Sequence, residues 1–146
     1  MKKDFFISYT HADKQWAEWI AQQLQDAGYS VILQSWDFKA GQNFIHKMDK
    51  ASKNSKRTIA VLSPDYLKAT YTVPEWTAAF RQDPKGEKGK LVPVHVRECK
   101  KQLNGILGPI AYIDLAGKDE ATARQQLLDD IRGSHRPTTP PPFPGP

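Results

Sequence analysis

Residues 57–63 read Arg-Thr-Ile-Ala-Val-Leu-Ser, a nearly continuous apolar run that Pro64 follows directly. A short apolar run with β-branched residues is typical of a strand that is covered on both faces, as the strands of a parallel sheet are. Parallel neighbours in a sheet require crossover connections, and these are usually helices. The run therefore predicts an α/β protein, and the segments on either side of it test that prediction.

Four further runs have the composition of short strands. They cover Asp4–Tyr9, Ser30–Gln34, Lys90–Val96 and Ile110–Ile113. Aromatic and β-branched residues favour the first of these as a buried strand. Pro93 cannot donate a backbone hydrogen bond, so it predicts a departure from regular pairing in the run that contains it.

A first helix is indicated between the first two of these strands. Thr10-His-Ala-Asp13 has the pattern of a capping box that opens a helix. Gly28 stands where a glycine commonly ends one. The apolar residues between these points recur at helical spacing, at Trp16, Ile20, Leu24 and Ala27.

Further helix signals alternate with the later strands. A short helix is expected from about Phe44 to Ser52, and a helical region follows Pro64 and is interrupted near Pro74. Asp119 is expected to start the last helix and Gly133 to end it. The apolar face of that last helix consists of Ala123, Leu127 and Ile131.

Five strands that alternate with helices imply right-handed crossovers and a parallel sheet. The expected fold is a flavodoxin-like three-layer α/β sandwich with a five-stranded parallel sheet. Ligands of such sheets bind beyond the carboxyl ends of the strands. Those ends correspond here to Ser8–His11, Gln34–Gly41 and Ser63–Glu75.

The composition of the chain changes sharply near Gly133. Residues 134–146 hold six of the eleven prolines, which argues against a helix or a central strand there. We expect residues 1–132 to form one domain. Residues 133–146 are expected to form an extended linker or tail that leads to a further domain in the full-length protein.

Composition also restricts the class of function. No apolar run approaches the roughly 18 residues that span a bilayer, and we expect no signal peptide, so the expected location is cytoplasmic, without a membrane partner. Cys99 is the one cysteine, and it excludes an internal disulfide and a zinc site with several thiolates. The net charge of +5 comes from scattered lysines and arginines, so we expect no nucleic-acid partner.

The loop after the first strand separates several families of this fold class. It reads Ser8-Tyr-Thr-His-Ala-Asp13 and contains no glycine, whereas a dinucleotide-binding Rossmann domain needs G-x-G-x-x-G there. The chain also lacks the G-x-x-x-x-G-K-[ST] motif of P-loop enzymes. The acidic pair and phosphoacceptor aspartate of a receiver domain are missing as well, and so is the phosphate loop of a flavodoxin.

Three segments carry a resemblance to the TIR domain in its bacterial form. Phe5-Phe-Ile-Ser-Tyr9 is similar to the first box of that family. Ser35-Trp-Asp-Phe-Lys-Ala-Gly-Gln-Asn-Phe44 resembles its loop after the second strand. Leu62-Ser-Pro-Asp-Tyr66 through Tyr71-Thr-Val-Pro-Glu-Trp76 resembles the segment after the third strand, where the family usually has W-C-x-x-E. The resemblance covers roughly residues 4–132 and implies the TIR fold.

The resemblance also implies an activity and a site. Many TIR domains cleave NAD+ between nicotinamide and ribose, and Glu75 matches their catalytic glutamate, whose carboxylate favours positive charge developing on the ribose. Asp65 is the nearest other carboxylate and is expected to cap the helix after Ser63. This chemistry needs no metal, and no cofactor is expected because NAD+ is the substrate. The residues expected to bind it are Phe6, Ser8, Tyr9, Thr10, His11, Trp36, Asp37 and Tyr71.

Several of these side chains have two interpretations. Tyr71 could stack on a planar base or pack in the core or within a helix, and His11 could meet a phosphate or remain a solvated loop residue. Asp37 could bond a ribose hydroxyl or order its own loop. Trp16 and Trp19 are expected in the core and at a half-buried surface rather than at a ligand.

Two departures from the family pattern keep a second function open. Tyr71-Thr72 replaces the usual Trp-Cys, and Pro74 directly precedes Glu75. Pro74 favours a helix start at that point, which places Glu75 in the first turn. The first hypothesis is an NAD+ hydrolase or cyclase of bacterial immune or cell-death signalling, active when copies of the domain self-associate. The alternative is a non-catalytic module that self-associates or docks on other TIR domains.

Overall fold

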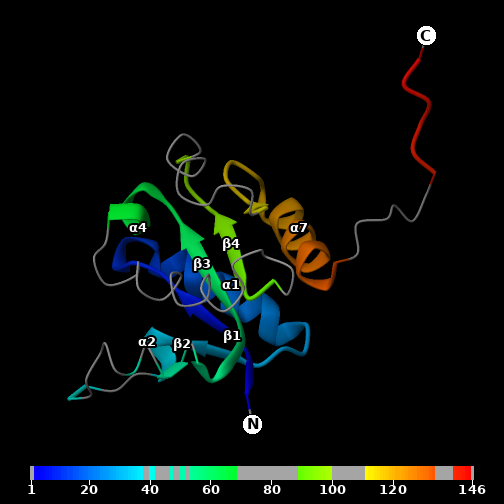
Figure 1. Cartoon of the computed structure of the whole chain (residues 1–146). Helices are drawn as coiled ribbons and strands as arrows, with labels where there is room; N and C mark the ends of the chain where they lie inside the picture. Colours follow the sequence, from blue (N-terminus) through cyan, green and yellow to red (C-terminus); the bar gives the residue numbers. More distant parts are fainter. Residues whose placement is uncertain are drawn as a thin grey trace.

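The computed structural model describes residues 2–37, 40–41, 47, 50–51, 53–68, 89–99, 111–133 and 140–145. Within these residues, parallel strands form one 5-stranded sheet in the order β2-β1-β3-β4-β5 (Figure 1). β3 lies at its centre and contains most of the apolar run 57–63. The predicted parallel α/β fold is therefore confirmed. The strands are β1 (Lys3–Ser8), β2 (Val31–Leu33), β3 (Ser55–Leu62), β4 (Leu91–His95) and β5 (Ile113–Asp114).

Helices cover both faces of this sheet. The main hydrophobic core lies between one face and the helices α1 and α7, which Figure 1 shows side by side. Successive residues of a strand point to opposite faces, so Phe5 joins this core while Phe6 packs with Ala51 on the other side. Tyr66 and Leu62 form a third cluster on that second side. The described helices are η1 (His11–Asp13), α1 (Lys14–Asp26), α2 (Gln34–Asp37), α4 (Pro64–Lys68) and α7 (Glu120–Arg132).

β1 pairs with β2 on one side and with β3 on the other. Phe6 aligns with Ile32 in the first pairing and with Thr58 in the second. The chain therefore winds in opposite directions from β1, which makes the carboxyl end of β1 and β3 the topological switch point where such folds bind ligands. The loops that begin after β1, β3 and β4 meet the solvent at this edge.

Two strand predictions need correction. β5 begins at Ile113, the last residue of the predicted strand 110–113. Its bounds are set by the pairing with β4, in which Ile113 aligns with Val94 and Asp114 with His95. Pro93 does not disturb the pairing of β4 with β3, in which it aligns with Ala60. The ladder between β4 and β5 starts only after Pro93, so the missing N–H group interrupts no ladder.

The predicted helix ends are largely confirmed. Gly28 and Gly133 both adopt positive φ, at 97° and 74°, as glycines that end helices commonly do. The side chain of Asp119 caps α7 by accepting a hydrogen bond of 2.8 Å from the backbone N–H of Thr122. Within the predicted helix 44–52, the described residues that are helical are Lys47, Lys50 and Ala51.

Residues 140–145 form neither helix nor strand, and the side chain of Phe143 is 82% exposed. The domain boundary near Gly133 and the linker role of the tail stay predictions. In the part of the chain that the structure describes, no helix is both long enough and apolar enough to cross a bilayer.

Candidate functional site

A network of polar side chains joins the loops at the carboxyl edge of the sheet. At its centre is Asp13, the last residue of η1, which is only 1% exposed. Its Oδ1 accepts a hydrogen bond of 2.7 Å from Nε of Arg97, which follows β4. Its Oδ2 accepts from the hydroxyl of Thr10 at 3.2 Å and from the hydroxyl of Ser63, which follows β3. A buried carboxylate requires such compensation, and here three side chains provide it.

Arg97 extends this network to the surface. While its Nε bonds to Asp13, its Nη2 donates to the carboxylate of Asp65 in α4. The side chains of Arg97 and Asp65 are 41% and 51% exposed, so this second pair faces the solvent. The hydrogen bonds to Asp13 and then to Asp65 raise the pKa of Arg97 further above its ordinary value. The hydrogen bond from Arg97 lowers the pKa of Asp65, so both groups stay charged at neutral pH.

This network corrects two predictions about helix starts. Asp65 does not cap α4, because the backbone N–H of Tyr66 donates instead to Oγ of Ser63 at 3.1 Å and the Asp65 carboxylate is held by Arg97. Thr10 and Asp13 do not form a capping box either. The Thr10 hydroxyl donates to the Asp13 side chain, and the Asp13 carboxylate turns to Arg97 rather than to a backbone N–H.

The sequence-predicted residues after β1 are placed at or below this edge. Phe6 and Ser8 are fully buried, and Tyr9 is 6% exposed. The hydroxyls of Ser8 and Tyr66 lie 3.1 Å apart and share a hydrogen bond. Thr10 is half-buried and His11 is exposed. Of this group, Thr10 and His11 are therefore the residues whose side chains reach the edge where a ligand would bind.

The predicted residues after β2 lie in α2. Trp36 is 42% exposed, which leaves its indole available at the surface. The Asp37 carboxylate accepts a hydrogen bond of 2.8 Å from the backbone N–H of Leu33, so it does order its own loop. Asp37 also lines a cleft of about 210 Å³ together with Ile32, Lys47, Lys50, Ala51 and Asn54. Tyr71 and Glu75 lie outside the described residues.

A second buried polar cluster lies at the end of β4. The His95 ring is fully buried, its Nδ1 lies 2.9 Å from Oδ1 of Asp114 in β5, and its Nε2 accepts from the backbone N–H of Cys99 at 3.1 Å. Because Nε2 is an acceptor, we assign the ring proton to Nδ1, which donates to Asp114. Burial raises the pKa of the Cys99 thiol. A thiol with a raised pKa is mostly protonated at neutral pH and is therefore a poor nucleophile.

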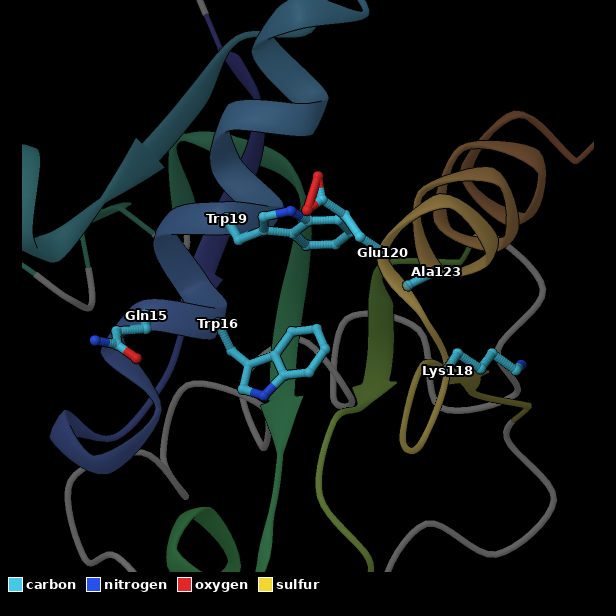
Figure 2. Close-up of a pocket in the computed structure, with 6 residues that line it drawn as sticks. All are labelled: Gln15, Trp16, Trp19, Lys118, Glu120 and Ala123. Atoms are coloured by element: carbon cyan, nitrogen blue, oxygen red, sulfur yellow. The ribbon is translucent and has the colours of Figure 1, made fainter.

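A cleft of about 330 Å³ lies between the first turns of α1 and the start of α7 (Figure 2). Trp16 and Trp19 lie along its α1 side with their ring centroids 5.8 Å apart, in an edge-to-face arrangement. Both indoles are half-buried and pack against the main core. Trp19 thus matches the half-buried surface position expected for it, while Trp16 is less buried than a core residue. The other lining residues are Gln15, Lys118, Glu120 and Ala123.

Sequence reasoning missed Asp13 and Arg97 as partners. A usable signal was present, because Arg97 is a charged residue directly after the fourth predicted strand, at the edge where ligands of this fold bind. Its partner could not be read from the sequence, since Asp13 lies 84 residues away. Only the strand order β1-β3-β4 brings the two loops together.

The parallel strand order and the polar carboxyl edge define a doubly wound α/β domain of the kind that binds ligands at its switch point. Within that class, the sequence model of the TIR domain family matches residues 5–128, and the chain belongs to this family. The fold agrees with that of the TIR domain of a Toll-related receptor from Hydra magnipapillata. The two align with a TM-score of 0.71 and 26% identity, over 90% of this chain and 99% of that one.

Two curated bacterial proteins are also similar in sequence. One is a 2′ cyclic ADP-D-ribose synthase from Acinetobacter baumannii, 31% identical over 86 residues, which are 58% of this chain and 32% of that protein. The other is a 2′ cyclic ADP-D-ribose synthase from Bacteroides thetaiotaomicron, 28% identical over 86 residues, 58% of this chain and 30% of that protein. The matched region thus spans about a third of each relative.

Proposed function

We propose that this TIR domain is an NAD+ nucleosidase, which cleaves the bond between nicotinamide and ribose and forms ADP-ribose or a cyclic ADP-ribose. The observation that carries the proposal is the similarity to two bacterial 2′ cyclic ADP-D-ribose synthases. ADP-ribose is the part of NAD+ that remains when nicotinamide leaves. An enzyme that makes its cyclic form from NAD+ must therefore break this bond first.

The chemistry requires little of the protein. Nicotinamide is a cationic leaving group, so the C1′–N bond breaks with its electron pair going to nitrogen, and positive charge develops on the ribose. Oxygen of water then bonds to C1′ and loses a proton, which gives ADP-ribose, or a hydroxyl of the same molecule does so, which gives a cyclic product. In this proposal the Glu75 carboxylate holds the ribose and stabilises the developing charge.

The other binding residues are proposed to act around the switch point. His11 is exposed after β1 and is proposed to meet a phosphate, while the exposed indole of Trp36 is proposed to contact the ligand from α2. Tyr71 is proposed to stack on a planar base. Asp37 already accepts a backbone hydrogen bond, so its proposed contact with a ribose hydroxyl uses its other carboxylate oxygen.

We propose further that the active form is a self-associated one, in bacterial immune or cell-death signalling. A single sheet edge of this size covers too little of a dinucleotide to orient it and to exclude water. A neighbouring copy can cover the rest of the ligand with its loop after β2. Such assembly is favoured when a larger protein or scaffold raises the local concentration of the domain.

The experiment that tests the proposal is incubation of the purified chain with NAD+ and measurement of released nicotinamide over a wide range of protein concentration. We expect nicotinamide release with a rate per molecule that rises with concentration, and rises again when the domain is fused to an oligomeric scaffold. Chromatography of the products separates ADP-ribose from a cyclic isomer. Absence of nicotinamide release from the scaffold-fused domain would contradict the proposal.

A non-catalytic adaptor is the second candidate. The replacement of the family's Trp-Cys by Tyr71-Thr72 and the position of Pro74 before Glu75 favour it. This candidate predicts self-association in the same concentration range with no release of nicotinamide, so the same experiment separates the two functions.

A further inference from the structure

The helix α4 connects the described carboxyl edge to the segment that carries the proposed catalytic residue. It spans Pro64–Lys68, so it ends three residues before Tyr71 and seven before Glu75. Five residues form little more than one turn, and a helix of this length has no stability of its own. Its orientation must therefore be set by contacts with the rest of the domain.

Among the contacts that α4 makes with other described residues, three matter here, and they differ in where they act. Ser63 caps the helix and Tyr66 is fully buried beneath it, with its hydroxyl 3.1 Å from that of Ser8. These two contacts fix the side of α4 that faces the sheet. The third contact, between Asp65 and Arg97, acts on the solvent side and ties α4 to the loop after β4.

The ion pair of Asp65 differs from an ordinary surface pair. Exposed ion pairs contribute little to the stability of a protein, in part because two long side chains lose conformational freedom when they meet. Here the guanidinium is already oriented by its hydrogen bond of 2.7 Å to the buried Asp13 carboxylate. Arg97 therefore presents Nη2 to Asp65 from a fixed position. A lysine is a poor replacement, because its single nitrogen cannot occupy both the position of Nε at Asp13 and that of Nη2 at Asp65.

We infer that Arg97 is a positioning residue for the proposed NAD+ cleavage. Its guanidinium links the buried carboxylate after β1 to Asp65 and so holds the solvent side of α4, the last described element before Glu75 in the sequence. The inference rests on the proposed function, and Arg97 itself need not touch the substrate. An error of about 1 Å in the position of a reacting group can cost on the order of a hundredfold in rate.

Asp65→Asn tests this inference with little risk to the fold, because Asp65 is half-exposed and the pair of Arg97 with buried Asp13 remains. We expect kcat for nicotinamide release to fall by about tenfold or more, with KM nearly unchanged and only a small fall in Tm. Asp65→Glu keeps a carboxylate and should recover much of the rate. In hydrogen exchange, the backbone amides of α4 should exchange faster in Asp65→Asn than in the wild type.

The matched control is Glu120→Gln. It removes the pair between Glu120 and Arg124, which has a distance of 2.8 Å and side chains that are 67% and 42% exposed, close to the exposure of the Asp65 pair. Glu120 belongs to α7 and lies outside the polar network, so this variant should keep the wild-type kcat. Arg97→Lys should lose activity as Asp65→Asn does. The double variant should be no slower than Arg97→Lys, because the two side chains act as one unit.

The outcomes are distinct. If the wild type releases nicotinamide and Asp65→Asn does so as fast as Glu120→Gln does, the positioning role is wrong and the proposed function stands. If Asp65→Glu is as slow as Asp65→Asn while exchange in α4 is unchanged, the positioning role is wrong as well. If the scaffold-fused wild type releases no nicotinamide at all, the proposed function fails and the inference falls with it.

Discussion

The end of β4 carries two polar clusters that begin only two residues apart and serve the molecule differently. His95 is fully buried, and both of its ring nitrogens have partners, one in β5 and one in the backbone of Cys99. Arg97 is 41% exposed and bonds a buried carboxylate with one nitrogen and a surface carboxylate with another. The first cluster is closed within the protein, while the second reaches from the core to the edge where a ligand would bind.

This difference separates stability from activity. A closed cluster holds together the elements that it joins. Its loss therefore affects mainly the free energy of unfolding. An open cluster that joins three loops at the switch point also sets the relative positions of those loops. We therefore expect variants of the His95 cluster to change the free energy of unfolding and variants of the Arg97 cluster to change turnover.

The largest expected change in turnover comes from replacing Glu75, the proposed catalytic residue. Glu75→Gln keeps the shape of the side chain and removes its charge, so it isolates the electrostatic stabilisation of the developing ribose cation. We expect kcat for nicotinamide release to fall by about a hundredfold or more. Circular dichroism and Tm serve as the control for folding. A folded variant with near wild-type turnover would show that Glu75 is not the catalytic residue.

His95→Phe tests the prediction that the His95 cluster serves stability rather than turnover. Phenylalanine fills a similar volume but leaves the Cys99 N–H and the Asp114 carboxylate without their buried partner. We expect the free energy of unfolding to fall by about 2–3 kcal/mol, measured by urea denaturation. Nicotinamide release per folded molecule should stay at the wild-type level.

The control for this variant is Glu98→Gln in the same loop. Glu98 is 70% exposed and lies 3.9 Å from His95, so its removal should change the free energy of unfolding by less than about 0.5 kcal/mol. If His95→Phe slows turnover per folded molecule as strongly as Asp65→Asn does, the proposed separation of stability from activity is wrong.

The sequence was sufficient for most of the described elements, but it did not predict α2, the bounds of β5 or the side-chain partners. Residues 59–62 of the central strand are all apolar, so their burial on both faces follows from their composition. β5 has only two residues, and its bounds depend on the register against β4 rather than on a local pattern. In the same way, Thr10–Asp13 matches a local motif, but its carboxylate has a stronger partner in Arg97, which is remote in sequence. The roles of Tyr71 and Glu75 stay predictions.

The smallest expected effect comes from a test of whether Asp65 differs from another exposed carboxylate with a lowered pKa. Asp119 provides the comparison. The side-chain and backbone hydrogen bonds of Thr122 lower its pKa from 3.8, as the hydrogen bond of Arg97 does for Asp65. A carboxylate whose pKa is lower in the folded state stabilises the fold above its unfolded pKa, and this contribution is lost as the pH falls through the folded value. Both residues should therefore add to stability at neutral pH and stop doing so well below pH 3.8.

Asp119→Ala should lower Tm by a few degrees at pH 7 through loss of the helix cap. The difference from the wild type should shrink when thermal unfolding is followed from pH 7 down to about pH 2. Turnover of Asp119→Ala at pH 7 should equal that of the wild type, because the cap of α7 lies outside the polar network of Asp13, Arg97 and Asp65. Asp65→Asn should show the reverse pattern, with a small change in Tm and a large change in turnover. If instead the two variants lose activity in proportion to their loss of stability, Asp65 acts only through the fold, and the open cluster at the end of β4 differs from the closed one in exposure alone.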